Sequence, residues 1–375
     1  MLKVPVFPFY KRCIILNSLT ACRALSKCTN YMDSEIKVFA KLSSESGRAL
    51  SKCTHYMNSK VKVFAKLSSE SGVDFWSKIL YTINVKFYKG ARKMKFTKMH
   101  GIGNDYIYVN CFDEEVENPE KVSIYVSDRH KGIGSDGLVL IMPSDIADFK
   151  MRIFNADGSE AMMCGNATRC IGKYVYDKGM TNKTEITLET NSGIKYLKLF
   201  PVDGKVESVE VDMGQAVLVP KDIPVISDKE RFISEPVDVD GKEYKITCVS
   251  MGNPHAIVYL DEINNLDLEK IGPSFENHKL FPDRINTEFI KVGDENTLYM
   301  RVWERGSGET FACGTGACAS VVASVLNGYC KQDSEVTVHL RGGDLKITWK
   351  SEGNVIMKGP AALICDGDVD VSFIK

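Results

Sequence analysis

The sequence predicts an α/β fold of the α+β kind, built from two related domains that each wrap a mainly antiparallel sheet or barrel around one central helix. Three features support this prediction: an internal repeat, many short β-branched segments, and two helices that each begin beside a cysteine. At 375 residues, the chain is long enough for two domains with substantial cores.

The internal repeat has one constant offset. Cys164 and Cys313 are 313 − 164 = 149 residues apart, and the segment "RIFNADGSEAMMCG" returns at the same spacing as "RVWERGSGETFACG". The segments "GND", "SDGLVLI" and "SGI" return in that register as "GNP", "RINTEFI" and "RGG". Four separated segments that match in one register indicate a duplication. We therefore expect domains at 94–210 and 211–358, an active site in the cleft between them, and a final segment, 359–375, that returns to the first domain.

Each predicted domain has several strands and one clear helix. Alternating or β-branched segments predict strands at 183–190, 205–213, 334–340 and 343–349. The helices cover about 167–179 and 316–328, and both end at a glycine. The second is apolar on all sides, which predicts a buried helix. Cys164 and Cys313 therefore lie at helix N-termini.

Residues 1–93 differ in composition from the rest of the chain. They hold 17 Lys and Arg against 5 Asp and Glu, and residues 23–47 return as 48–72 with 21 of 25 positions identical. This basic extension is expected to be disordered or separate from the enzyme. Translation could begin at Met94, or the extension could be an organelle-targeting segment or an accessory region.

Composition excludes several classes of protein. No run of 18 apolar residues is present, so we expect no membrane span. Eight cysteines spread over the residues after Met94 favour free thiols in a reducing cytoplasm over a disulfide scaffold. Cys164 and Cys170, like Cys313 and Cys318, lack zinc-ligand spacing, so no metal is expected. The acidic region after Met94 has no nucleic-acid or dinucleotide motif.

The two cysteines suit one kind of chemistry. Unpaired N–H groups at a helix N-terminus favour a thiolate and can bind a substrate carboxylate. Two such thiols aimed at one cleft could take a proton from one face of a carbon and deliver one to the other face. The alternative is that both cysteines are small buried hydrophobic residues.

Six segments together resemble the diaminopimelate epimerase family. They are "KMHGIGNDYIYV", "RHKGIGSDGLVLI", "FNADGSEAMMCGNATRC", "NPHA", "RINTEFI" and "RVWERGSGETFACGTGACA". The resemblance runs from Met94 almost to the C-terminus. It implies an isomerase that interconverts LL- and meso-2,6-diaminopimelate for lysine and peptidoglycan synthesis, without pyridoxal phosphate, any other cofactor or a metal. It also implies a cytoplasmic homodimer.

The resemblance assigns roles by position. Cys164 and Cys313 are the acid–base pair, and His255 and Glu304 adjust the acidity of the two thiols. The expected substrate-binding residues are Asn104, Asn155, Gly165, Asn166, Asn253, Asn286, Glu304, Arg305, Gly314 and Thr315. Within this set, backbone groups at 165–166 and 314–315 hold the reacting carboxylate, and Glu304 holds the ammonium. Gly137 stands where some members carry a substrate-binding Gln, so no contact is expected there.

Two other functions remain open at this stage. A racemase of the proline racemase type would share the two cysteines. Its substrate would require an apolar pocket, whereas Arg305 and several Asn residues suit a second polar amino-acid end. A binding protein that has lost catalysis is the other possibility, although both cysteines and Glu304 are present.

Overall fold

The computed structural model describes residues 13–16, 37–42, 65–67 and 93–374. The chain divides into two compact units, Met1–Arg92 and Lys93–Lys375. In the first unit, the described residues form a parallel three-stranded sheet of β1 (Cys13–Leu16), β2 (Lys37–Leu42) and β3 (Ala65–Leu67). The expectations for residues 1–93 fall mostly outside the described residues.

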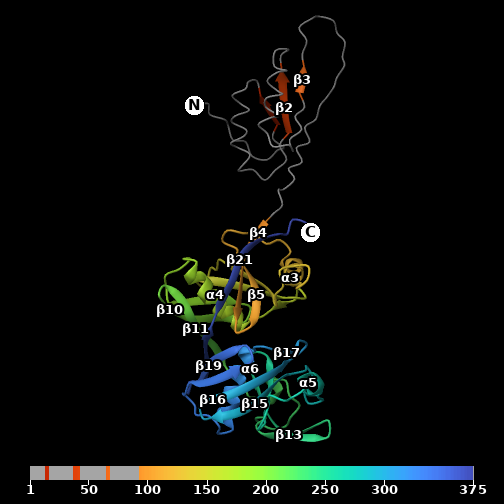
Figure 1. The fold of residues 1–375 in the computed structure, drawn as a ribbon, viewed down its shortest axis with the longest axis vertical. Helices are drawn as coiled ribbons and strands as arrows, with labels where there is room; N and C mark the ends of the chain where they lie inside the picture. The colour runs from red at the N-terminus through yellow and green to blue at the C-terminus, as the bar shows by residue number, and fades with distance from the viewer. Residues whose placement is uncertain (1–12, 17–36, 43–64, 68–92, 375) are drawn as a thin grey trace, which may run out of the picture. The chain divides into compact units, whose positions relative to one another are not determined.

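The second unit consists of two lobes with the same order of elements (Figure 1). The strands of the first lobe pair in the order β21 (Ala362–Asp370), β4 (Lys93–Gly101), β5 (Asn104–Asn110), β6 (Gly137–Met142), β7 (Phe149–Asn155), β9 (Glu185–Thr190), β10 (Gly193–Val202) and β11 (Lys205–Gln215). Those of the second pair in the order β12 (Glu235–Val239), β13 (Lys242–Ser250), β14 (Pro254–Tyr259), β15 (Asn286–Asp294), β16 (Thr297–Glu304), β18 (Val336–Leu340), β19 (Gly343–Trp349) and β20 (Asn354–Pro360).

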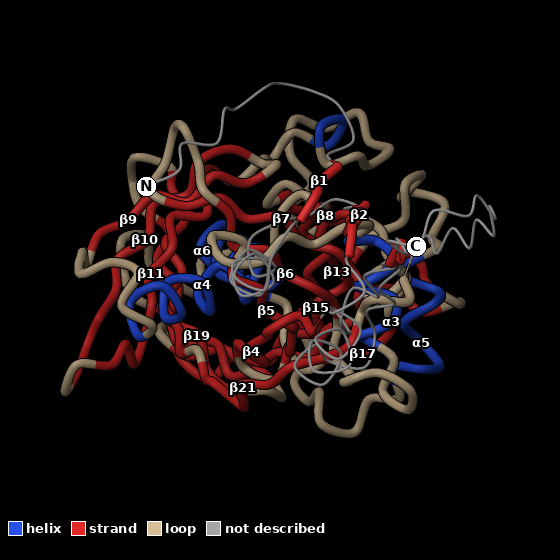
Figure 2. The backbone as a smooth tube through the Cα atoms, turned by 90° about the horizontal axis from the view of Figure 1, so that it is seen from above, coloured by secondary structure: helices blue, strands red, loops and turns tan. Residues whose placement is uncertain are grey.

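Each lobe wraps its strands around one buried helix, α4 (Gly165–Asp177) or α6 (Gly314–Leu326). Both helices lie among strands in the view of Figure 2. Most strand pairs are antiparallel, with two parallel pairs in each lobe. Antiparallel pairing of β11 with β20 joins the lobes into one open sheet that ends at β21 and β12. The short strands β8 (Glu160–Ala161) and β17 (Gly308–Thr310) pair with β7 and β16. The predicted duplicated fold is confirmed.

The offset of the sequence repeat holds for whole elements. Helix α4 begins at Gly165 and α6 at Gly314, and 314 − 165 = 149; β4 begins at Lys93 and β13 at Lys242, and 242 − 93 = 149. Gly179 and Gly328, which follow the two helices, both adopt positive φ, at 72° and 76°. Glycine adopts this backbone conformation without steric cost, so the same stop signal ends both helices.

The structure also differs from the sequence-based expectation. Each lobe has a second helix that was not predicted, α3 (Pro119–Ser127) or α5 (Leu268–Glu276). The strand that pairs with β4 is β21 (Ala362–Asp370), which lies within the final segment 359–375.

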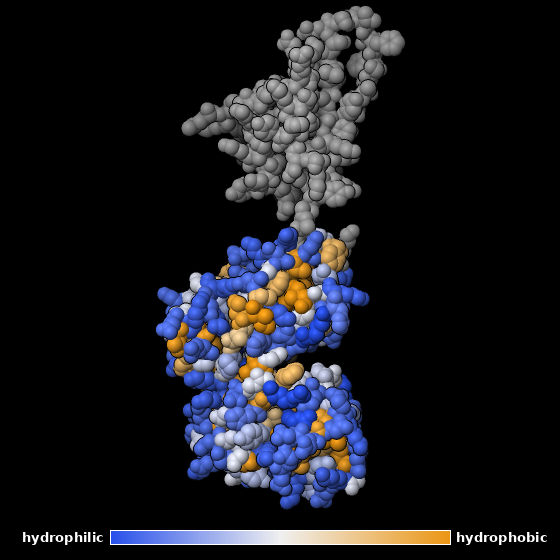
Figure 3. Space-filling view, viewed as in Figure 1, coloured by the Kyte–Doolittle hydropathy of each residue, from blue (hydrophilic) through white to orange (hydrophobic). Residues whose placement is uncertain are grey.

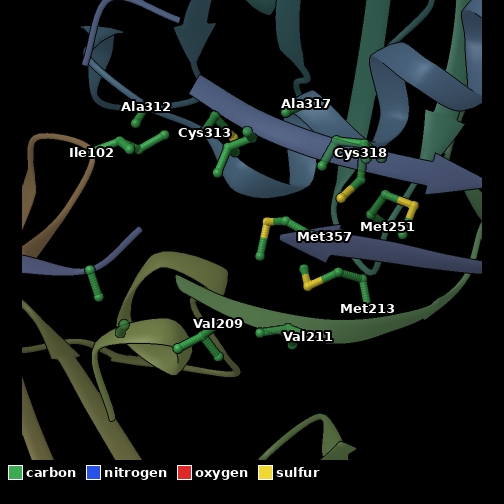
Figure 4. Packing of buried hydrophobic residues seen from close by; sticks show 14 of the residues in the cluster. Ile102, Val209, Val211, Met213, Met251, Ala312, Cys313, Ala317, Cys318 and Met357 are labelled. Atoms are coloured by element: carbon green, nitrogen blue, oxygen red, sulfur yellow. The ribbon is translucent and has the colours of Figure 1, made fainter. Parts of the chain in front are cut away.

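Sulfur-containing side chains lie close to the strand pair that joins the lobes. Met213 of β11 and Met357 of β20 lie next to each other near the starts of the two central helices (Figure 4). The eight cysteines in 93–374 are all unpaired, as expected. Within the described part of the chain, no helix has the length and apolarity needed to cross a bilayer.

Candidate active site

Cys164 and Cys313 occupy equivalent positions in the two lobes. Each is the N-cap residue of the central helix in its lobe, with extended backbone at φ −135° and −118° respectively. The backbone N–H of Gly316 donates to Cys313 Sγ at 3.4 Å, so the first turn of α6 is directed at the thiol. The prediction that both cysteines lie at helix N-termini is confirmed.

The two helix N-termini approach each other closely. A Cβ atom on Gly165 would lie 2.8 Å from Met357 Cε, and one on Gly314 would lie 3.2 Å from Met357 Sδ. Asn166 Nδ2 donates to the carbonyl oxygen of Ala312 in the other lobe at 3.4 Å. Glycine after each cysteine therefore lets the two helix starts pack against one shared methionine.

A cleft separates the two lobes on one side of the second unit (Figure 3). Figure 3 shows the indentation between the two lobes of the second unit. The lobes touch where a Cβ atom on Gly342 would lie 1.8 Å from the carbonyl oxygen of Ile102, and where one on Gly103 would lie 3.1 Å from Phe311 Cβ. The Phe311 side chain is exposed beside this contact. Bulkier residues at these glycines would hold the lobes apart.

The hydrogen-bond partner of the Cys164 thiol is a neutral amide. Its Sγ lies 3.5 Å from Asn104 Oδ1, which also accepts from Asn166 Nδ2 at 3.3 Å. Asn104 Nδ2 in turn donates to Asp136 at 2.7 Å. The phenol of Tyr106 is buried nearby, and burial, followed by the charges of Cys164 and Asp136, raises its pKa well above the usual value. Asp136, which fixes the orientation of the Asn104 amide, was not predicted from the sequence.

Carboxylates surround Cys313. Glu304 lies close enough to Cys313 for its charge to raise the thiol pKa, and it accepts from the hydroxyl of Thr310. Burial raises the pKa of Glu304, and the charge of Glu288 adds to this effect. The hydroxyl of Thr315 lies 3.5 Å from Cys313 Sγ.

A buried His–Glu pair lies behind Cys313. His255 Nδ1 hydrogen-bonds with Glu288 Oε1 at 2.7 Å, and both side chains are fully buried. The other nitrogen, Nε2, meets Asn253 Oδ1 at 3.1 Å, while Glu288 Oε2 has no hydrogen-bond partner. Sequence reasoning missed Glu288. The available signal was an acidic residue within the apolar strand "NTEFI", because a buried carboxylate requires a specific partner.

The same groups define the set of possible metal ligands within the described residues. One atom each from His255, Glu288 and Cys313 lie within 4.8 Å of one another. The hydrogen bond between His255 and Glu288 accounts for this geometry without an ion. A Cβ atom on Gly316 would lie 2.4 Å from Glu288 Oε1, so the carboxylate is tightly packed.

The expectation that the helix N-termini favour thiolates, and so lower the pKa values of the two cysteines, is wrong. Burial raises the pKa of Cys164 and exceeds the lowering by the N–H groups of Ala167 and Asn166 and by Arg169. Burial also raises the pKa of Cys313 well above its usual value, and Glu304 and Glu288 raise it further. Desolvation of a thiolate outweighs the helix N-terminus here, and burial of this extent cannot be read from a cysteine's position alone.

Three predicted binding residues hydrogen-bond within their own lobes. Asn155 Nδ2 donates to the Ser159 hydroxyl at 3.0 Å. Asn286 Nδ2 donates to the carbonyl oxygen of Pro254 at 2.9 Å, and its Oδ1 accepts from the backbone N–H of Arg305 at 2.9 Å. These bonds fix the orientation of both amides. The guanidinium of Arg305 itself donates to the carbonyl oxygen of Asp283 at 2.7 Å.

Gly137 has no room for a side chain. A Cβ atom there would lie 2.0 Å from the carbonyl oxygen of Phe154 and 2.8 Å from Tyr106 Cε1. The Phe154 carbonyl and the ring of Tyr106 therefore occupy the space that a side chain at this position would need. This packing gives a physical reason for the departure from the family pattern.

The duplicated fold and the paired N-cap thiols together define an epimerase-type isomerase. Solved structures with this fold include a hydroxyproline epimerase from Agrobacterium vitis, with 14% identity and a TM-score of 0.55 over 75% of this chain and 93% of that one. A probable proline racemase from Agrobacterium radiobacter has 13% identity and a TM-score of 0.58 over 74% and 93%. At these identities, the likeness establishes the fold alone.

Sequence comparison identifies the family. The diaminopimelate epimerase family model matches residues 96–219 and 247–364, and the chain belongs to this family. A diaminopimelate epimerase of Acetivibrio thermocellus is 64% identical over 280 residues, which cover 74% of this chain and 99% of the relative. The diaminopimelate epimerase of Methanococcus maripaludis is 57% identical over 279 residues, covering 74% and 100%.

Proposed function

We propose that this enzyme interconverts LL- and meso-2,6-diaminopimelate in the synthesis of lysine and peptidoglycan precursors. The observation that carries the proposal is the presence of one thiol at the start of each central helix, with the two helix starts packed against Met357. Family membership supports diaminopimelate as the substrate.

The reaction uses the two thiols on opposite faces of the α-carbon. One cysteine, as thiolate, takes the α-proton, and the other, as thiol, gives its proton to the opposite face. The pair holds one proton before and after the reaction, so turnover only exchanges which sulfur carries it. Reversing the roles of Cys164 and Cys313 gives the reverse reaction.

The carbanion between these steps needs fixed positive dipoles, because its own carboxylate and ammonium supply the only other stabilisation. The backbone N–H groups of Gly165 and Asn166 and those of Gly314 and Thr315 would bind the carboxylate from two helix N-termini. Glu304 would pair with the reacting ammonium. That ammonium would also offset the burial that disfavours the thiolates. The mechanism needs neither a cofactor nor a metal.

The remaining polar groups would hold the distal amino-acid end and adjust the thiols. His255, which is hydrogen-bonded to Glu288, would adjust the acidity of the Cys313 thiol. The groups assigned to substrate binding beyond the reacting centre are Asn104, Asn155, Asn253, Asn286 and Arg305. We assign the domains to 94–210 and 211–358, with 359–375 returning to the first, and infer that their closure excludes water.

We further propose a cytoplasmic homodimer. Strand β21 pairs with β4 along one edge, and its side chains Leu363 and Ile364 are 45% and 48% exposed. An unpaired strand edge with exposed apolar residues favours association with a second copy. We assign no membrane or nucleic-acid partner.

One assay separates the candidate functions. The purified 375-residue chain should convert LL-diaminopimelate to the meso form, resolved by chiral chromatography, and should leave L-proline unchanged. Racemisation of proline would support the proline racemase class instead. Failure on both substrates by folded, reduced protein would support a binding protein that has lost catalysis.

A further inference from the structure

Two amide side chains link the lobes beside Cys164. Asn166, in the first turn of α4, donates from Nδ2 to Asn104 Oδ1 at 3.3 Å and to the carbonyl oxygen of Ala312 in the second lobe at 3.4 Å. Asn104, at the start of β5, donates from its own Nδ2 to Asp136 Oδ2 at 2.7 Å. The two amides therefore form a chain whose hydrogen bonds run in one direction, from Asn166 to Asp136.

The groups at the two ends of this chain set its direction. A guanidinium can only donate hydrogen bonds, and a carboxylate can only accept them. Arg169 donates to Asn166 Oδ1 at 2.8 Å, so the Asn166 amide turns its Nδ2 away from the guanidinium and toward Asn104. At the other end, the Asp136 carboxylate accepts from Asn104 Nδ2, so Asn104 Oδ1 points back toward Asn166. Turning either amide by a half-turn would place donor against donor or acceptor against acceptor.

Both ends are held in place by further contacts. Asp136 Oδ2 also accepts from the backbone N–H of Asp105 at 3.0 Å, and its Oδ1 pairs with the guanidinium of Arg129 at 2.9 Å. Burial raises the pKa of Asp136, while these hydrogen bonds lower it and favour the ionised carboxylate. Arg169 is fully buried and also donates to the carbonyl oxygen of Pro360 at 3.2 Å. The two ends are therefore fixed, and the amides between them have one satisfied orientation.

This orientation decides which atom faces the Cys164 thiol. Its Sγ lies 3.5 Å from Asn104 Oδ1, an oxygen that can only accept hydrogen bonds. A thiol satisfies this oxygen by donating its S–H, whereas a thiolate would set a negative charge against the lone pairs of the oxygen. Burial independently raises the pKa of Cys164, which also favours the thiol. An S–H that points at Asn104 Oδ1 is therefore the arrangement that satisfies both atoms.

The second lobe carries other residue types at the positions of this chain. At the offset of the repeat, which is 318 − 169 = 149, the counterparts are Cys318 for Arg169, Thr315 for Asn166 and Ile285 for Asp136. The Sγ of Cys313 instead accepts from the backbone N–H of Gly316 at 3.4 Å. Cys164 thus donates a hydrogen bond where Cys313 accepts one, so the amide chain serves the thiol of the first lobe.

We propose that Asp136 and Arg169 are positioning residues for the reaction. From the two ends of the amide chain they turn Asn104 Oδ1 toward Cys164, and this oxygen holds the thiol as a hydrogen-bond donor in the substrate-free enzyme. The contact fixes both the rotamer of Sγ and the position of its proton. Because displacing a reacting group by about 1 Å can lower a rate about a hundredfold, loss of either end should slow the reaction.

This inference rests on the proposed function in treating Cys164 as one of the two reacting thiols. When Cys164 acts as the acid, its S–H turns from Asn104 Oδ1 to the substrate carbon, and Asn166 Nδ2 still donates to that oxygen. When Cys164 acts as the base, the thiol formed by proton uptake can donate to Oδ1 again. The chain therefore gives the protonated thiol one defined position in both directions of the reaction.

The first test is the infrared S–H stretching band of Cys164 in the substrate-free, reduced 375-residue protein at neutral pH. The band is isolated as the difference between the wild type and Cys164→Ser, whose hydroxyl can donate to the same oxygen and so keeps the chain. We expect a band at lower wavenumber than that of ethanethiol in an apolar solvent, because donating a hydrogen bond weakens the S–H bond. A missing band, or one at the wavenumber of the unbonded thiol, would overturn the proposal.

Variants at Asp136 separate its role as an acceptor from its charge. Asp136→Leu, which removes both oxygens, should let the Asn104 amide turn, move the Cys164 band toward that of the unbonded thiol, and lower kcat by about ten- to a hundredfold. Asp136→Asn keeps an oxygen for the two N–H groups and should restore both the band and kcat to near the wild type. An unmoved band in Asp136→Leu, or no recovery in Asp136→Asn, would contradict the proposal.

The matched control is Asp148→Leu in the same lobe. Asp148 makes the same kinds of contact as Asp136, because it accepts from the backbone N–H of Thr187 at 2.9 Å and pairs with Lys183 at 2.6 Å. It is not part of the amide chain, so its replacement should leave the Cys164 band and kcat unchanged. Equal shifts in Asp148→Leu and Asp136→Leu would show a general effect of losing an ion pair and would refute the positioning role.

The other end of the chain keeps the test decisive if Asp136→Leu fails to fold. Arg169→Met removes every donor to Asn166 Oδ1 and should move the Cys164 band in the same direction, whereas Arg169→Lys retains a donor and should move it less. A band that stays in place in Arg169→Met would refute the role of Arg169. The position of the band does not depend on turnover, so activity on another amino acid would refute the proposed substrate without changing it.

Discussion

The two lobes share their backbone plan but differ in the side chains that surround their cysteines. Helices α3 and α5, like α4 and α6, have identical lengths and start 149 residues apart, since 268 − 119 = 149. Three acidic or titratable positions of the second lobe have neutral counterparts at that offset: His255 with Tyr106, Glu288 with Val139, and Glu304 with Asn155. Duplication thus preserved the placement of a thiol at a helix start, whereas the electrostatic surroundings diverged.

An arginine–glutamate ion pair, in contrast, is the same in both lobes. Arg152 binds Glu160 through two hydrogen bonds of 2.8 and 2.9 Å, and Arg301 binds Glu309 in the same way at 2.8 and 3.0 Å. These pairs brace the strand and the turn that lead to each cysteine. Symmetric residues therefore support the backbone, while asymmetric ones adjust the chemistry.

The largest expected effect comes from removing either cysteine. Cys164→Ala and Cys313→Ala should each lower kcat for epimerisation by at least about a thousandfold, because inversion needs an acid and a base on opposite faces. The double variant should be little worse than either single one, since the two thiols act as a unit. Chiral chromatography of the products measures kcat for each variant. Near-normal turnover by either single variant would refute the claim that epimerisation requires both thiols.

Gly316→Ala should disrupt the second lobe alone. The added Cβ atom would lie 2.4 Å from Glu288 Oε1 and 3.2 Å from Cys313 Sγ. We expect a loss of about 1–3 kcal/mol in the free energy of unfolding, as for other overpacked sites, together with reduced activity.

The first lobe supplies the control, because its equivalent residue is already Ala167. Ala167→Gly should cost only about 1 kcal/mol through helix propensity. Urea denaturation of both variants measures the difference. A Gly316→Ala protein as stable and active as the wild type would indicate that Glu288 is not tightly packed behind the thiol.

A smaller effect is expected at the distal end of the substrate. Arg305→Ala should weaken substrate binding by about 1.5–3 kcal/mol, the usual contribution of a charged hydrogen bond. Most of the change should appear in KM, with a part in kcat because remote contacts orient the reacting centre. If steady-state kinetics with LL-diaminopimelate gave wild-type values for both constants, Arg305 would have no part in binding.

The smallest effect is expected from removing residues 1–93. A chain that begins at Met94 keeps both lobes and loses a single residue of β4, Lys93, which pairs with Asp370. Its kcat/KM should equal that of the full chain, because every residue assigned to the site lies after Met94. An insoluble or inactive shortened protein would make the extension part of the enzyme.

The repeat made much of the fold predictable from the sequence. Its constant offset placed both central helices, and the glycines after them marked where they end. Helices α3 and α5 were missed because each is only nine residues long, and because Pro273 interrupts the helical pattern of α5.

The site was less predictable than the fold. Glu288 and Asp136 contact site residues only through tertiary structure, which brings β15 beside β14 and the loop before β6 beside β5. The direction of the thiol pKa shift depends on desolvation, and the local sequence of a helix N-terminus contains no measure of desolvation.

The central claim is that one thiol from each lobe acts on opposite faces of the same carbon. The most direct measurement is proton NMR and mass spectrometry of LL-diaminopimelate converted by the wild-type enzyme in D₂O, stopped at low conversion. The meso product should carry one deuterium at the inverted carbon, because the donating thiol has exchanged with solvent, while the remaining LL substrate keeps its hydrogen. Product that retains its original hydrogen, or LL substrate labelled as fast as product forms, would contradict the two-thiol mechanism.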